Sequence, residues 1–246
     1  MPSECAVVIT GSAGGIGSAL VNAFRRHGYH VIGVDREWTQ NASHSLKFDL
    51  EEMVVNEANV NTFQNELESA LEGRQLVALV NNAAVQILGA VDTLTVAEFR
   101  KTIDVNLVAA FAMIKACLPK LRCARGTVIN IGSIHARLTK HEFSAYAASK
   151  GGLESLTRAL AVELGGLIQV AAISPAAVDT PMLRAGFANA PEALSELAEC
   201  HPSARLAQPE EIGELAVFLA SGRISFVNGA VIDMQGGIGG RLHDPV

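Results

Sequence analysis

The motif TGSAGGIG, from Thr10 to Gly17, is the strongest indication of the fold in this chain. It follows the aliphatic run Cys5–Thr10 and precedes a segment with apolar residues at helical spacing, so we expect a turn between a first strand and a first helix. Glycines let the backbone approach a ligand closely, and the N-terminus of the helix offers free N–H groups to a phosphate. This context favours a nucleotide-binding turn over an ordinary βα turn. The residues expected to contact a dinucleotide are Gly11, Ser12, Gly15, Ile16 and Gly17.

Short aliphatic runs alternate with longer segments of helical periodicity along the rest of the chain. Such β-α-β alternation predicts a parallel sheet with helices on both faces. We therefore expect an α/β protein with a single doubly wound Rossmann domain over residues 1–246 and a sheet of about seven strands. The expected strands are Cys5–Thr10, His30–Asp35, Leu46–Leu50, Leu76–Asn81, Thr127–Ser133, Gln169–Ser174 and Ala230–Met234.

Composition and charge exclude several classes of protein. Hydrophobic residues make up 49% of the 246 positions, which excludes a disordered chain. The net charge is −6 without a cluster of Lys and Arg, so neither nucleic acid nor a membrane is expected as a partner. The four cysteines form no C-x-x-C pair, which speaks against a metal site and for the reduced thiols of a cytoplasmic protein. Neither a signal peptide nor a run of about 18 apolar residues is recognisable, so no membrane-spanning helix is expected.

An acidic residue, Asp35, ends the second expected strand and is followed by Arg36. A carboxylate at this place can accept hydrogen bonds from the adenosine ribose of a dinucleotide, and it would repel a 2′-phosphate. Asp35 therefore favours NAD over NADP as the cofactor. Arg36 leaves NADP as the alternative, because a guanidinium can hold a phosphate. A solvated side chain, or one stacked on adenine, is the other interpretation of Arg36.

A phenol and an ammonium group lie four residues apart in the segment Tyr146-Ala147-Ala148-Ser149-Lys150, which places them on one helix face. A tyrosine with a pKa near 10 is a poor base at neutral pH, but a nearby cation favours the phenolate. We expect Lys150 to lower the pKa of Tyr146 in this way. Ser133, which precedes Tyr146 by 13 residues, ends an expected strand, where open α/β sheets bind their ligands.

With these residues in place, the chain resembles the short-chain dehydrogenase/reductase family in its NAD(P)-binding Rossmann form. The resemblance spans essentially the whole chain, and the joint order of its motifs is far more specific than any one of them. Several positions depart from the family pattern; among them, Ala84 and Ala176 stand where glycine is usual. The motifs are the Gly turn from Thr10 to Gly17, Asp49-Leu50, Asn81-Asn82-Ala83-Ala84, Asn106, Ser133, Tyr146 with Lys150, and Ser174-Pro175 leading to Thr180.

The resemblance implies a role for each matched residue. Tyr146 would be the general acid/base, Ser133 would polarise the substrate oxygen, and Lys150 would hold the nicotinamide ribose. Asn106 would hold a water that links Lys150 to solvent. The remaining positions would contact the cofactor: Asp49 and Leu50 at the adenine, Asn82, Ala83 and Ala84 at the adenosine side, and Pro175, Val178 and Thr180 at the nicotinamide.

We therefore expect an NAD-dependent oxidoreductase that interconverts a secondary alcohol and a ketone. His135, two residues after Ser133, and Met182 are candidates for the substrate pocket, together with Ser133 and Tyr146. The segment 179–206 contains three prolines and no expected strand, and is interpreted as a lid over a small-molecule substrate. The alternatives are an NADPH-dependent 3-oxoacyl-type ketoreductase and a non-catalytic regulator or scaffold that senses NAD. Relatives in the family also make a homodimer or homotetramer the expected assembly.

Overall fold

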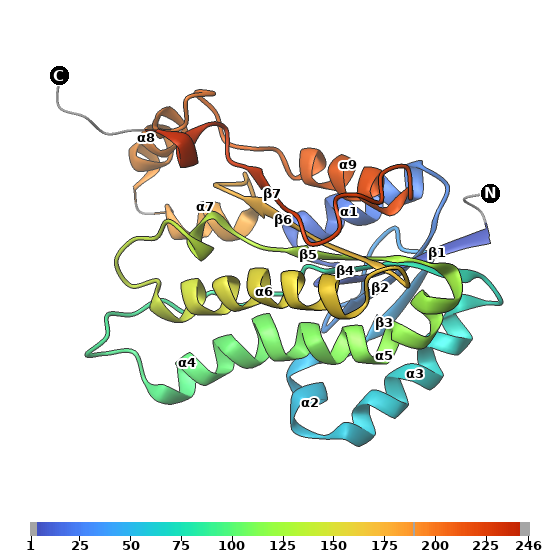
Figure 1. The fold of residues 1–246 in the computed structure, drawn as a ribbon. Helices are drawn as coiled ribbons and strands as arrows, with labels where there is room; N and C mark the ends of the chain where they lie inside the picture. The colour runs from blue at the N-terminus through green and yellow to red at the C-terminus, as the bar shows by residue number, and fades with distance from the viewer. Residues whose placement is uncertain (1–3, 189, 242–246) are drawn as a thin grey trace.

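A parallel sheet of seven strands forms the centre of the molecule, in the order β3-β2-β1-β4-β5-β6-β7 (Figure 1). It is seen in a computed structural model that describes residues 4–188 and 190–241. The chain reverses direction across the sheet between β1 and β4, which is the switch point of a doubly wound fold. The sequence prediction of a doubly wound parallel sheet is confirmed. The strands are β1 (Cys5–Thr10), β2 (His30–Asp35), β3 (His44–Lys47), β4 (Gln75–Asn81), β5 (Thr127–Ile131), β6 (Gln169–Pro175) and β7 (Val231–Met234).

Two hydrophobic clusters fill the space between the sheet and its helices. On one face, α1 (Gly15–Arg26) and α9 (Pro209–Ala220) pack over side chains such as Val7 and Ile9 of β1. On the other face, α3 (Glu57–Leu71), α5 (Ala109–Ala124) and α6 (Ser144–Glu163) pack over alternate residues of the same strands. Figure 1 shows α1 and α9 above the sheet and α3, α5 and α6 below it. Because both faces are covered, the strands are buried and read as aliphatic runs in the sequence.

The third strand lies earlier than the sequence suggested. We expected this strand at residues 46–50, but the residues that pair with β2 are His44–Lys47. In this pairing Ile32 lies opposite His44, and Asp35 lies opposite Lys47. The chain then turns into helix α2 (Leu50–Val55), whose N-terminus is capped because the Asp49 carboxylate accepts a hydrogen bond from the Glu51 N–H. The strand cannot continue to residue 50, because the Asp49 cap makes Leu50 the first residue of a helix.

The expected long helix is divided by a wide turn. Helix α4 (Val96–Ile103) passes through a π-helical turn, η2 (Asp104–Val108), into α5, and Asn106 lies inside that turn. The run Val96–Ala124 is long and apolar enough by length and composition to cross a membrane, which the count of consecutive apolar residues did not reveal. Buried residues of α5 such as Met113 pack on the sheet, as in the core helix of a globular domain.

The segment between β6 and α9 contains two short helices, α7 (Pro181–Gly186) and α8 (Pro191–Cys200). Both lie beyond the end of β6 in Figure 1. Within residues 4–188 and 190–241 the 179–206 segment forms no strand, and a single bridge from Val178 to Ala207 ties its two ends together. The segment is thus attached to the carboxyl edge of the sheet at both ends.

Candidate active site

Ser133 lies just past the carboxyl end of β5, two residues beyond the last residue of that strand. It begins a 3-10 helix, η3 (Ile134–Ala136), and its Oγ accepts a hydrogen bond from the His135 N–H over 3.2 Å. The Gly132 N–H donates to the Ile173 carbonyl of β6 over 2.7 Å, so the segment is held against the neighbouring strand. The strand is shorter than expected, but the Ser133 hydroxyl still lies at the sheet edge.

Tyr146 and Lys150 lie in the first two turns of α6, which begins at Ser144. The Lys150 Nζ donates a hydrogen bond of 2.8 Å to the Ile131 carbonyl, the last residue of β5, and lies 5.7 Å from the centre of the Tyr146 ring. Only 2% of Lys150 is exposed, and this burial lowers its pKa to about 8. The structure therefore brings Ser133, Tyr146 and Lys150 together at the end of one strand.

The pKa of Tyr146 differs from the expectation. Burial raises the pKa of its phenol above the ordinary value, and a hydrogen bond with the Ser133 side chain is the contact that lowers it. Lys150 does not lower this pKa as the sequence predicts, and its ammonium group donates its hydrogen bond to the Ile131 carbonyl. In the structure, the contact that lowers the pKa of the phenol comes from Ser133 and not from Lys150.

Asn106 is 1% exposed and holds the loop after β4 in place. Its Oδ1 accepts a hydrogen bond of 2.8 Å from the Val85 N–H, and its Nδ2 donates to the Val85 carbonyl over 2.9 Å. The same Nδ2 donates to the Ser149 Oγ over 3.0 Å, and Ser149 in turn donates to the Tyr146 carbonyl over 2.7 Å. Asn106 is thus connected to the backbone of the catalytic candidate, although it does not contact Lys150 directly. A π-helical turn directs this side chain inward, as such turns often do at functional sites.

An aromatic group covers one side of Tyr146. The His135 ring stacks on Phe143 with ring centres 4.2 Å apart, and both rings meet the Tyr146 ring edge-on. Burial, with a smaller effect of the Lys140 charge, lowers the pKa of His135 to about 4. His135 is therefore neutral at neutral pH and lies beside the phenol. Phe143 is a member of this group that the sequence did not reveal.

The Gly turn has the shape that the sequence predicts. Gly11 has a φ of +63°, and a Cβ there would lie 2.7 Å from the Ala83 Cα. A Cβ on Gly17 would lie 2.0 Å from the Gly11 carbonyl oxygen, so both positions require glycine. The N-terminus of α1 carries no side-chain cap, which leaves backbone N–H groups free for an anion. Asp35 faces the turn from β2, where its Oδ2 accepts a hydrogen bond of 2.9 Å from the Ala13 N–H.

Hydrogen bonds from the residues after β4 hold the Gly turn in its conformation. The Asn82 Nδ2 donates to the carbonyls of Thr10 and Gly11, each over 3.0 Å. The Thr10 Oγ1 accepts from the N–H groups of Asn82 and Ala83. The amide nitrogen of Asn82, expected at the adenosine side of the cofactor, is thus committed to the turn. Asp49 caps α2, and the adjacent Leu50 is buried in the core.

The start of the 179–206 segment lies against the Gly turn. A Cβ on Gly15 would lie 3.0 Å from Thr180 and from the ring of Pro181. The Thr180 Oγ1 caps α7 by accepting a hydrogen bond from the Leu183 N–H, and both Pro175 and Val178 are buried. Met182 is 59% exposed on α7, and the structure does not bring it to Tyr146. Ser12 is buried and shares a hydrogen bond of 2.5 Å with Thr39.

Ala84 and Ala176, which stand where the family has glycine, cause no backbone strain. Neither Ala84 nor Ala176 is among the described residues with a positive φ. The Ala176 N–H donates to the Met234 carbonyl over 3.1 Å, so this turn continues the pairing of β6 with β7. Arg36 is exposed at the end of β2. Among the described residues, no group of His, Cys, Asp and Glu could hold a metal ion.

Residues 11–239 match the family model described as "Enoyl-(Acyl carrier protein) reductase". A 3beta-hydroxysteroid dehydrogenase 1 from Eggerthella lenta is 32% identical over 243 residues, covering 94% of this chain and 92% of that protein. This chain belongs to the short-chain dehydrogenase/reductase family. The L-fucose dehydrogenase of Oryctolagus cuniculus is similar to this chain as well, with 32% identity over 94% of this chain and 84% of that protein.

A solved structure from Beutenbergia cavernae, assigned as an NAD(P)-dependent gluconate 5-dehydrogenase and carrying NADP, superposes with a TM-score of 0.86. It is 29% identical and covers 96% of this chain and 97% of that chain. This short-chain dehydrogenase/reductase is accordingly an oxidoreductase that acts on CH–OH groups with a nicotinamide dinucleotide. The Gly turn and the uncapped start of α1 fit such a cofactor, because they offer close backbone approach and free N–H groups.

Proposed function

We propose that this enzyme is an NAD-dependent dehydrogenase that interconverts a small secondary alcohol and its ketone, with Tyr146 as the general acid/base. The observation that carries the proposal is the meeting of Tyr146, Ser133 and the buried Lys150 at the carboxyl end of β5. A sugar, a cyclic diol or a hydroxy acid is the substrate class that we favour. The activities in the names of the steroid, fucose and gluconate relatives support this range.

The side chains divide the chemistry of alcohol oxidation between them. The Tyr146 phenolate takes the proton of the substrate hydroxyl, and the Ser133 hydroxyl donates a hydrogen bond to the oxygen as its negative charge grows. Lys150, with a pKa of about 8, keeps most of its positive charge at neutral pH and would hold the nicotinamide ribose. When bound, the nicotinamide supplies the hydride acceptor. In ketone reduction the same phenol donates its proton.

The choice of NAD rests on Asp35. Its carboxylate is fixed by two backbone N–H groups, those of Ala13 and Glu37, at the edge of the Gly turn. A fixed negative charge at this place accepts hydrogen bonds from a ribose and repels a 2′-phosphate. Arg36 supports the second candidate, an NADPH-dependent 3-oxoacyl-type ketoreductase, because its exposed guanidinium follows Asp35 directly.

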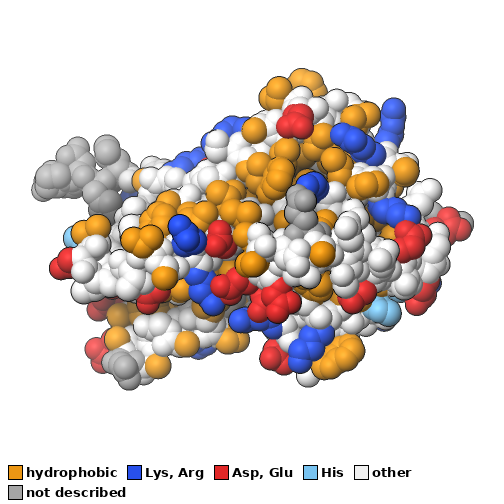
Figure 2. Space-filling view, turned by 90° about the horizontal axis from the view of Figure 1, so that it is seen from below, with side chains coloured by type: hydrophobic (Ala, Val, Ile, Leu, Met, Phe, Trp, Pro, Cys, Tyr) orange, Lys and Arg blue, Asp and Glu red, His pale blue; other side chains and the backbone are white. Residues whose placement is uncertain are grey.

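Exposed apolar side chains support a homodimer or homotetramer. Phe99 of α4, Phe111 of α5 and Val162 of α6 are exposed large hydrophobic residues. Figure 2 shows hydrophobic side chains gathered among charged ones on the side of the molecule below the sheet. A second copy of the chain would cover such a face, and light scattering after size-exclusion chromatography measures the assembly. We also place the enzyme in the cytoplasm, in keeping with cysteines that form no disulfide in the described part of the chain.

A panel of alcohols and ketones, followed by the absorbance of NADH, tests the proposed reaction. Tyr146→Phe removes the proton donor but keeps the ring, so we expect turnover to fall by about a thousandfold or more while NADH binding is retained. Arg26→Gln, in an exposed ion pair between α1 and α9, is the control and should keep its activity. Full activity in Tyr146→Phe would reject the mechanism, and a wild type that binds NAD without turnover would favour the regulator.

A further inference from the structure

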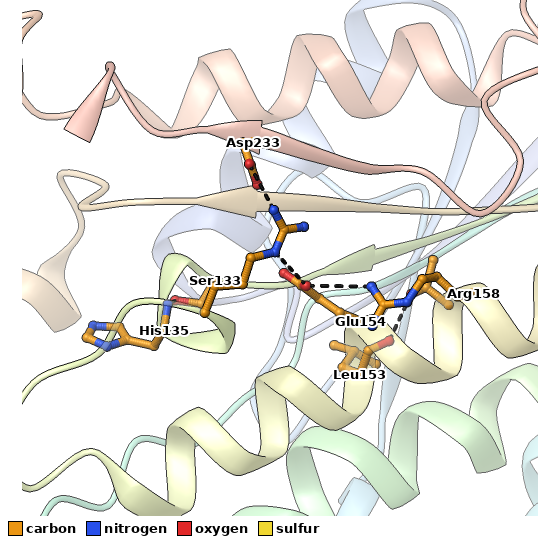
Figure 3. A network of polar contacts seen from close by, with 8 residues as sticks. Ser133, His135, Leu153, Glu154, Arg158 and Asp233 are labelled. Atoms are coloured by element: carbon orange, nitrogen blue, oxygen red, sulfur yellow. Dashed lines mark hydrogen bonds and ion pairs between the residues drawn. The ribbon is translucent and has the colours of Figure 1, made fainter. Parts of the chain in front are cut away.

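A buried carboxylate lies on the catalytic face of α6. Glu154 follows Lys150 by four residues and Tyr146 by eight, which places all of them along one side of the helix. The Glu154 side chain is 3% exposed, and its Oε1 has no hydrogen-bond partner among the described residues. Its Oε2 is 3.3 Å from the Nε of Arg137 and 3.8 Å from the NH1 of Arg158. Figure 3 shows Glu154 between Arg158 and the strand that carries Asp233.

Arg137 connects this carboxylate to two other parts of the site. It follows the short helix η3, whose N-cap is Ser133, and its N–H donates to the Ile134 carbonyl over 3.0 Å. Its NH1 lies 3.2 Å from the Asp233 Oδ2 on β7. One guanidinium therefore joins the segment that carries Ser133, the helix that carries Tyr146, and the edge strand β7.

This contact differs from an ordinary surface ion pair. Exposed pairs contribute little, because water screens both charges. Here the Glu154 carboxylate is buried, so loss of Arg137 would leave a buried charge with only the more distant Arg158 beside it. The segment that Arg137 anchors is a single turn, in which the Ala136 N–H donates to the Ser133 carbonyl over 2.9 Å. A displacement of Arg137 therefore moves Ser133.

We infer that Arg137 and Glu154 are positioning residues: their ion pair fixes the segment 133–137 against α6 and thereby holds the Ser133 hydroxyl at the Tyr146 phenol. Asp233 keeps the guanidinium in place from the other side. The catalytic meaning of this pair rests on the proposed function, but the geometry of the phenol can be tested without turnover.

The pKa of Tyr146 reports the position of Ser133 directly. Burial raises this pKa and the hydrogen bond with Ser133 lowers it. The other groups that face the ring are Lys150, His135 and the uncharged Phe143. His135, with a pKa of about 4, stays neutral throughout the titration, whereas Lys150, with a pKa of about 8, loses its proton within it. Since the variants below keep both groups, a change in the Tyr146 pKa arises either from the charge that is removed or from a displacement of Ser133, and the sign of the change distinguishes the two.

The chain contains only two tyrosines, which makes the titration simple. Tyr29→Phe leaves Tyr146 as the sole signal in NMR spectra of protein labelled at the tyrosine Cζ. In this background we expect Arg137→Gln and Glu154→Leu to raise the Tyr146 pKa by about half a unit or more, in the same direction as Ser133→Ala. Direct electrostatics predicts the opposite sign for Glu154→Leu, since loss of a negative charge favours the phenolate.

Glu154→Leu is thus the decisive variant. A Tyr146 pKa that falls or stays the same in it would overturn the inference, and so would a further rise when Glu154→Leu is added to Ser133→Ala, because direct electrostatics alone would lower the pKa there. Leucine has a similar volume, and Arg137 is half exposed and can be solvated, so the variant should fold. Glu154→Gln replaces it if it does not, with the same expected sign. Arg26→Gln is the control and should leave the pKa unchanged.

Kinetics separate this inference from the proposed reaction. We expect Arg137→Gln to lower kcat for alcohol oxidation about tenfold, while the dissociation constant for NADH changes by less than about twofold. A wild type without turnover would contradict the proposed function and leave the NMR result to decide the positioning pair. A wild type with turnover and an Arg137→Gln variant with unchanged kcat would overturn the positioning role alone.

Discussion

Replacement of Asp35 by asparagine should shift the cofactor preference of this enzyme. The Asp35 carboxylate uses its Oδ2 to accept a hydrogen bond from the Ala13 N–H over 2.9 Å and its Oδ1 to accept one from the Glu37 N–H over 3.2 Å. Asparagine has the same size and keeps one carbonyl acceptor, so the Gly turn should retain its shape. What Asp35→Asn removes is the negative charge beside the expected adenosine ribose.

The size of the effect follows from two contributions. Two like charges about 5 Å apart repel by about 3 kcal/mol at an effective dielectric constant near 20, and water around the half-buried Asp35 reduces this to about 1 kcal/mol. A hydrogen bond from a ribose hydroxyl to a charged acceptor is stronger than one to a neutral acceptor by about 1 kcal/mol. The sum, about 2 kcal/mol, corresponds to about a 30-fold change in the ratio of the two dissociation constants.

The chain supplies its own probe for this measurement. Trp38 is its single tryptophan, lies three residues after Asp35 and is 69% exposed. Energy transfer from this indole to a bound reduced nicotinamide reports NADH and NADPH binding in the same titration. We expect the wild type to bind NADH at least about 30-fold more tightly than NADPH, and Asp35→Asn to bind the two about equally.

A neighbouring carboxylate provides the matched control. Glu37→Gln removes one negative charge two residues further along, from an exposed side chain, and should change the ratio by less than about threefold. A ratio in Asp35→Asn that equals the wild-type ratio would refute the assignment of Asp35 to the ribose. A wild type that prefers NADPH would refute it as well and would favour the ketoreductase.

Two further predictions concern stability. Asn106→Ala removes three buried hydrogen bonds, two with Val85 and one with Ser149. It should lower the free energy of unfolding, measured by urea titration, by about 3 kcal/mol. A loss below about 1 kcal/mol would contradict the role of Asn106 in holding the loop after β4. For His135, the folded pKa of about 4 lies below the unfolded value of 6.5, so the unfolded chain binds the proton first and stability falls as the pH drops from 6.5 towards 4. The midpoint of thermal unfolding should therefore decrease less between pH 7 and pH 5 in His135→Gln than in the wild type or in His141→Gln, an exposed histidine of the same loop. Equal decreases in all three would contradict the burial of His135.

Local pattern was sufficient for much of the fold. The aliphatic runs at Cys5–Thr10 and His30–Asp35 form strands with the bounds that the sequence predicts, because their periodicity and length are properties of the segment itself. The Gly turn is another such case: Gly11 and Gly17 are required by the backbone that passes between a strand and a helix. The third strand is a different case, because the Asp49 cap starts helix α2 and the strand ends at Lys47, earlier than expected.

The doubly wound sheet, the Gly turn and the residue types available for catalysis can be predicted from the sequence, because these follow from short-range spacing. Which of these groups meet depends on the tertiary packing. The Ser133 contact that lowers the Tyr146 pKa, the hydrogen bonds between Asn106 and Val85, and the ion pairs of Arg137 join residues that are distant along the chain. Their geometry depends on how α6, the π-helical turn and β7 pack together, and no spacing within a single segment encodes that packing.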